Sequence, residues 1–273
     1  MNWDLWSRQI DAIVRLELKR YWLGRRWIAI YLLALAPCAL LTMRIIAAFT
    51  TGERTLGGSL NTLNLVYAGI FQAFILRFAI FFSCMIIFSQ LFRGEILEKT
   101  LHYYLLSPVR REVLALGKYT AGVIATTTLF GFSTIASYLL MFLPSPSAAG
   151  LFTSGEGIPH LARYLIVAML GCIGYGAVFL LVGLYVRNPM APALAILGWE
   201  YFNFLLPSWL QKISVVHYLQ NLCPVSIPKS PFAVLTDPTS PFISIPSLII
   251  FTGVVLVLVA QKTRRTEITY STD

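Results

Sequence analysis

The chain has 273 residues, of which 57% are hydrophobic and only 12% are Asp, Glu, Lys or Arg, about half the charged share of an average soluble domain. A mean hydropathy of +0.73 excludes a water-soluble enzyme, because too few polar residues remain to cover a globule of 30.5 kDa. In so apolar a chain, the net charge of +9 is typical of basic cytoplasmic loops facing lipid headgroups and not of nucleic-acid binding.

The first 26 residues predict an amphipathic helix that lies in the membrane interface. Apolar side chains recur at helical spacing along one side, and charged side chains occupy the other. The apolar side includes Trp6, Ile10, Val14, Leu18 and Trp22. Tryptophans near both ends favour the interface over the alternative, a cytoplasmic helix packed on a soluble partner.

The remainder predicts an all-α integral membrane protein with six transmembrane helices within residues 27–260. A helix needs about 20 apolar residues to cross the hydrocarbon core. The six segments are 27–49, 65–92, 119–143, 161–186, 190–210 and 243–260. Asn188 and Pro189 indicate a tight turn between the fourth and fifth of them. A long external loop over 207–242, with a short re-entrant or surface helix near 209–222, and a tail over 261–273 complete the chain.

The distribution of basic residues predicts the orientation. Fifteen of the 21 Lys and Arg residues precede the first span, connect spans two and three or four and five, or follow the sixth. Because short cytoplasmic loops are enriched in Lys and Arg, we expect both termini in the cytoplasm and a multi-pass protein of the plasma or inner membrane.

Two charges are expected inside the membrane, Arg77 in the second span and Glu200 in the fifth. The helical rise puts them about 15 Å and about 10 Å deep, similar enough for pairing. We expect them to pair or to line a translocation path near a dimer axis. A purely structural ion pair within one subunit is the alternative.

No constellation of catalytic or metal-binding residues stands out. The four cysteines and three histidines are scattered, without CxxC spacing. A row of small residues on the fourth span, Ala168, Cys172 and Gly176, indicates close helix packing. The sequence therefore predicts neither an enzyme nor a metal site.

The connection after the second span, residues 93–118, has a pattern of its own. Glu95 to Leu106 predicts a short amphipathic helix, which Ser107 and Pro108 end. A short, charged, helical loop is suited to docking another protein, and an ordinary interfacial hairpin is the alternative.

This connection resembles the loop between the second and third membrane helices of ABC-2 type transporter permeases. In that family a Glu precedes Gly-Thr-Leu-Glu, a Leu-Leu pair, Ser/Thr-Pro and a Gly-Lys that opens the third helix. The matching positions are Glu95, Thr100, Leu101, Leu105, Leu106, Ser107, Pro108, Gly117 and Lys118. The chain departs from the pattern at Lys99, where Gly is usual, and at His102, where the second Glu is usual.

The resemblance implies the membrane subunit of an ATP-driven exporter for an amphipathic drug, lipid or peptide-like substrate. Such a subunit pairs with a second permease copy, as a homodimer or heterodimer, and binds a separate ABC ATPase that uses ATP and Mg. The implied coupling loop comprises Glu95, Glu98, Thr100, Leu101, Leu105, Leu106, Ser107 and Pro108. The chain has no GxxxxGK[ST], so we expect no ATP hydrolysis and no directly bound cofactor. The alternative is a permease-like relay that transports nothing and passes ATPase motion to a membrane or external partner.

Overall fold

The computed structural model is all-helical, with no strand among the residues that it describes. These are residues 3–23, 27–51, 59–97, 110–144, 155, 157–186, 188–205, 207–211, 213–226 and 240–265. The middle of the predicted coupling loop, residues 98–109, and the end of the predicted tail, residues 266–273, lie outside the described residues.

Among the described residues, five stretches of helix are long and apolar enough to cross a bilayer, which makes the chain a membrane protein. They belong to α2 (Ile28–Thr51), the continuous series α3 (Leu60–Gly69), η2 (Ile70–Ile80) and α4 (Phe81–Leu97), α6 (Arg111–Phe142), α8 (Gly157–Tyr185) and α12 (Pro241–Arg265). The shorter helices are α1 (Trp3–Leu23), α9 (Met190–Tyr201), η3 (Phe202–Leu205), α10 (Ser208–Gln211) and α11 (Val215–Leu222).

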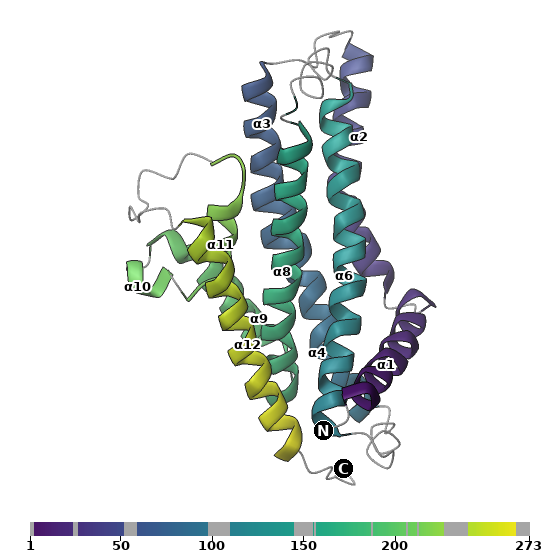
Figure 1. Ribbon diagram of the computed structural model, residues 1–273. Coiled ribbons are helices and arrows are strands. Elements are labelled where there is room, and N and C mark those ends of the chain that lie inside the picture. Colours follow the sequence, from purple (N-terminus) through teal and green to yellow (C-terminus); the bar gives the residue numbers. More distant parts are fainter. Residues whose placement is uncertain are drawn as a thin grey trace.

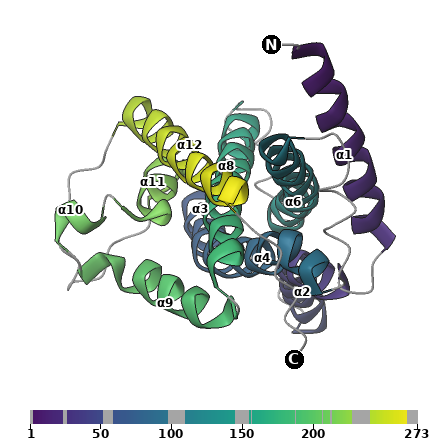
Figure 2. The ribbon, with the colours of Figure 1, turned by 90° about the horizontal axis from the view of Figure 1, so that it is seen from below.

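The long helices form one bundle, with α8 in its middle (Figure 1; Figure 2). Small residues on α8 allow α4 to approach closely. A Cβ at Gly183 would lie 2.6 Å from the carbonyl oxygen of Ser89, and one at Gly176 would lie 2.7 Å from the ring of Phe88. Cys172 is fully buried on the same helix. The row of small residues is thus part of the helix packing.

The helices α8 and α12 run in the same direction. Their last turns meet, because the Lys262 ammonium lies 4.7 Å from the centroid of the Tyr185 ring. Earlier along both helices, Leu248 packs at the position of Gly174. The chain between α8 and α12 must therefore return towards the opposite end of the bundle, and α9, η3, α10 and α11 lie on this return. We call the end where α8 and α12 finish the basal end; it is the lower end in Figure 1.

The helix bounds differ most from the sequence expectation in two places. The helix predicted over 190–210 stops at Tyr201, and η3 follows, so that α9 has only 12 residues, or about 18 Å of helix. The helix predicted to begin at residue 119 begins at Arg111. Residues 111–118, assigned to the coupling loop, are helical because their small and apolar side chains pack against α1 and α4.

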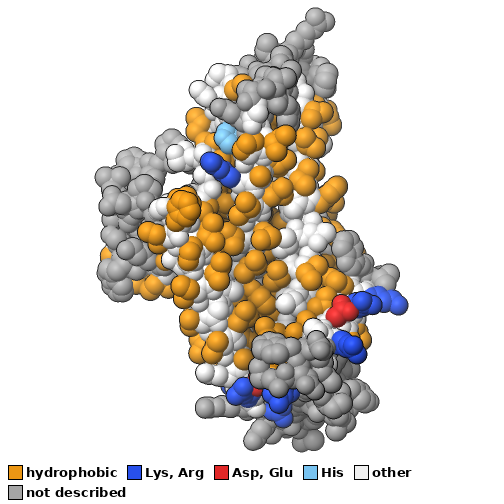
Figure 3. All heavy atoms as spheres, viewed as in Figure 1, with side chains coloured by type: hydrophobic (Ala, Val, Ile, Leu, Met, Phe, Trp, Pro, Cys, Tyr) orange, Lys and Arg blue, Asp and Glu red, His pale blue; other side chains and the backbone are white. Residues whose placement is uncertain are grey.

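Side-chain types are segregated along the bundle. Figure 3 shows hydrophobic side chains over the middle of one face and most of that face's Lys and Arg side chains in its basal part. A band of apolar side chains bounded by basic ones is the pattern expected of a protein in contact with acyl chains and headgroups.

Candidate functional site

The first helix packs lengthwise on the basal half of α6. Its apolar side chains face the bundle, and Arg8, Asp11, Arg15 and Lys19 are exposed on the other side. Ile13 fills the space beside Gly117, where a Cβ would come within 2.9 Å of its Cγ2. The apolar face predicted from Trp6, Ile10, Val14 and Leu18 is at least partly buried; the side chain of Trp22 lies outside the described part.

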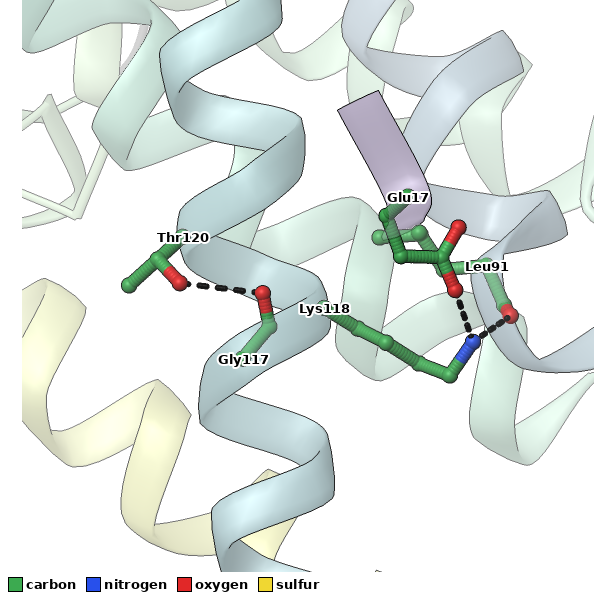
Figure 4. A network of polar contacts seen from close by, with 5 residues as sticks. All are labelled: Glu17, Leu91, Gly117, Lys118 and Thr120. Carbon is green, nitrogen blue, oxygen red and sulfur yellow. Dashed lines mark hydrogen bonds and ion pairs between the residues drawn. The ribbon is translucent and has the colours of Figure 1, made fainter. Parts of the chain in front are cut away.

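A buried ion pair joins α1 to α6. The Lys118 ammonium donates to Oε1 of Glu17 at 2.5 Å, and the two side chains are 0% and 3% exposed. The same ammonium also donates to the carbonyl oxygen of Leu91 on α4, at 3.4 Å (Figure 4). One lysine therefore connects three helices at the basal end.

This ion pair lies at one end of the predicted coupling loop, residues 93–118, because Lys118 is the last residue of that segment. The helix α4 leads into residues 98–109, and α6 begins directly after them. Arg110, just before α6, has its guanidinium 5.3 Å from the centroid of the Trp6 ring on α1. The first helix thus contacts Arg110, just before α6, and also Gly117 and Lys118, which lie seven and eight residues further along the chain.

A second ion pair lies at the same end of the bundle, but at its surface. Arg264 of α12 pairs with Glu112 in the first turn of α6, and these side chains are 65% and 27% exposed. Arg111 donates to the carbonyl oxygen of Arg264 at 3.0 Å. The last turn of α12 is thereby held against the start of α6.

The residues proposed for ATPase coupling are for the most part outside the described chain. Glu95 belongs to the last turn of α4, and its side chain is not among those described. The others, namely Glu98, Thr100, Leu101, Leu105, Leu106, Ser107 and Pro108, lie outside the described residues. Their role stays a prediction.

The carboxylate of Glu200 is buried at the end of α9 and fully engaged. It accepts hydrogen bonds from the hydroxyl of Ser214 at 2.5 Å and from the backbone N–H groups of Val215 and Val216, both at 3.2 Å. These two amides open α11, where the helix dipole favours a negative charge. The start of α11 and the Ser214 hydroxyl therefore stabilise the Glu200 carboxylate.

Arg77 lies in the middle of the longest span, 17 residues from both Leu60 and Gly94. It belongs to η2, a π-helical stretch of 11 residues, and such stretches occur frequently at functional sites. Its guanidinium lies 5.7 Å from the centroid of the Tyr201 ring, beside Glu200 in sequence. No ion pair within 4.0 Å joins these two described residues, Arg77 and Glu200. An arginine at this depth costs about 2.5–3.5 kcal/mol.

Sequence reasoning found Arg77, Glu200 and Lys118 but missed Glu17 and Ser214. A signal for Glu17 exists, because it falls within the apolar stripe of Ile13, Val14, Leu18 and Tyr21. A charge on such a stripe points to a buried partner. The described residues contain no group of three or more His, Cys, Asp or Glu side chains placed to hold a metal ion.

Comparison with known proteins gives no family assignment. No model of a known protein family matches the chain, and no curated protein is similar to it in sequence.

Proposed function

We propose that the chain is the membrane subunit of an ABC-2 type exporter, which forms the pathway for an amphipathic substrate and couples to a separate ATPase subunit. The observation that carries the proposal is the junction of α1, α4 and α6 around the Glu17–Lys118 ion pair. Two of these helices, α4 and α6, flank residues 98–109, the segment whose sequence resembles a coupling loop. A force applied to that segment would reach α1, α4 and α6 through a rigid, buried connection.

The proposal includes a sixth membrane segment and cytoplasmic termini. Five crossings alone would leave the two ends of the chain on opposite sides. The parallel course of α8 and α12 supports a return across the membrane by α9, η3 and the segments that follow. Lys and Arg at the basal end support its assignment to the cytoplasm, with α1 as an interfacial helix. Reporter proteins fused to either terminus would then report the cytoplasmic side.

The decisive experiment is reconstitution with an ATPase encoded beside this chain. We expect the two chains to copurify, the membrane chain to change the ATPase rate, and vesicles containing both to move an amphipathic dye in an ATP-dependent manner. Substituting Leu105 and Leu106 by Ser should abolish both the complex and the change in rate. Leu143, which is 66% exposed at the opposite end of α6, supplies the matched control Leu143→Ser.

Three outcomes separate the possibilities. A complex with ATPase coupling and dye movement supports the exporter. A complex with ATPase coupling but no movement of any cargo supports the relay that transports nothing. If no ATPase binds, or if the Leu105 and Leu106 variants bind as well as Leu143→Ser does, the coupling function is refuted.

A further inference from the structure

The surroundings of Arg77 combine one cation with aromatic rings that face outward from the fold. Its guanidinium lies against the Tyr201 ring, which is 42% exposed, and the residues next in sequence to Arg77 and Tyr201, Phe78 and Phe202, are 39% and 61% exposed. Figure 2 shows α9, which carries Tyr201, set to the side of the bundle. Within the described part of the chain, these rings therefore keep an exposed surface.

Arg77 makes no hydrogen bond to a residue that the structure describes. Its Nε is buried without a partner, and no hydrogen-bond acceptor or carboxylate contacts the guanidinium in the part of the chain that the structure describes. Glu200, the acid next to Tyr201 in sequence, already accepts hydrogen bonds from Ser214 and from the start of α11. A guanidinium offers five N–H donors in a planar fork that matches a carboxylate, sulfate or phosphate.

A second polar atom near Arg77 also lacks a partner. The hydroxyl of Tyr175, on α8, makes no hydrogen bond although the side chain is only 1% exposed. The Tyr175 ring packs on that of Phe81, with 5.4 Å between the ring centroids, and Phe81 lies four residues after Arg77 in the same continuous helical series. A buried hydroxyl and a buried guanidinium nitrogen, both without an acceptor among the described residues, are donors that an incoming anion would satisfy.

We infer that Arg77, Tyr201 and Tyr175 form a binding site for the anionic group of an amphipathic ligand, whose apolar body lies against the exposed aromatic rings. Charge complementarity favours this ligand, because an anionic group both accepts hydrogen bonds from the Arg77 guanidinium and carries the opposite charge, which a neutral or cationic amphipath does not. The inference deepens the proposed export function and rests on it for treating the ligand as cargo.

The test measures binding to the purified chain in phosphatidylcholine nanodiscs, without any ATPase. The probe is a dansyl-labelled fatty acid, compared with its methyl ester. We expect the carboxylate to bind about tenfold more tightly than the ester, in keeping with a charge-assisted pair. Arg77→Gln should remove this preference and Arg77→Lys should keep part of it. Arg163→Gln, which changes an exposed arginine of α8, should keep all of it.

The outcomes are distinct. Equal affinity for acid and ester in the unmodified chain overturns the site whether or not any variant folds. It is also overturned if Arg77→Gln keeps the preference, or if that variant changes only the oligomeric state. Displacement of the probe by phosphatidylglycerol supports the site with bilayer lipid as its source, and no displacement supports it with a free amphipath. Because no ATPase is present, this binding result does not depend on whether the chain couples to an ATPase. The binding site and the proposed export function can therefore fail separately.

Discussion

Two buried charge sites differ in how their charges are satisfied. At the basal end, Lys118 and Glu17 contact each other directly, and a carbonyl oxygen completes the site. Halfway along the bundle, Glu200 is satisfied by Ser214 and two amides, whereas Arg77 has only an aromatic ring. At the first site both charges have direct partners within the chain, whereas at the second the Arg77 guanidinium has no hydrogen-bond acceptor among the described residues.

Because their charges are satisfied differently, we expect the two sites to have different functions. A complete buried pair resists separation, because either charge alone is costly in a low-dielectric interior. It is therefore suited to hold helices together and to transmit a displacement. A guanidinium without a hydrogen-bond acceptor can instead bind an anion that arrives from outside, and the new hydrogen bonds contribute to the binding free energy. Stability measurements can test the first role separately from ligand binding.

The largest effect is expected from breaking the basal pair on one side. Lys118→Met leaves the carboxylate of Glu17 buried without its cation, which costs about 3–5 kcal/mol of unfolding free energy. The measurement is denaturant-induced unfolding of the purified chain in a mild detergent. Reduced yield of folded protein from membranes should accompany the loss.

The double variant Glu17→Leu, Lys118→Met is the control for that substitution. Replacing both charges by apolar side chains of similar size is often neutral or stabilising, so most of the lost stability should return. A double variant as unstable as Lys118→Met alone would mean that packing, and not an unpaired charge, causes the loss. If stability does return, coupling to an ATPase can be measured in the double variant.

A smaller effect is expected from Ser214→Ala. Ser214 caps α11, because its Oγ accepts a hydrogen bond from the His217 N–H at 3.4 Å, and it also donates to Glu200. Ser59 caps α3 through Thr62 N–H at the same 3.4 Å but contacts no acid. Ser214→Ala should therefore cost about 1.5–3 kcal/mol more than Ser59→Ala, the contribution of a hydrogen bond to a charged group. Equal losses in unfolding free energy would show that Glu200 does not depend on the hydroxyl.

Sequence periodicity predicted the long helices and the first amphipathic helix, because a bilayer imposes length and apolarity on every crossing. It could not predict where α9 ends. Glu200 needs donors from a helix that begins 15 residues later, and this long-range demand leaves no local pattern. Likewise, apolar content predicted one helix over 190–210, although α9 ends at Tyr201 and η3 follows. The sequence indicated that Arg77 and Glu200 lie in apolar segments, but which partner each one has depends on the fold.

The smallest effect is expected at the exposed pair of the basal end. Arg264 and Glu112 also join α6 to another helix, but their side chains are largely in contact with solvent, where ions screen the attraction. A double-mutant cycle of Arg264→Ala and Glu112→Ala should give a coupling energy that is measurable at low salt and vanishes at physiological ionic strength. The cycle on Glu17 and Lys118 should give a coupling that salt barely changes, because no ion reaches the buried pair. Equal salt dependence of the two couplings would contradict the burial of Glu17 and Lys118 and would weaken the case that their junction transmits force.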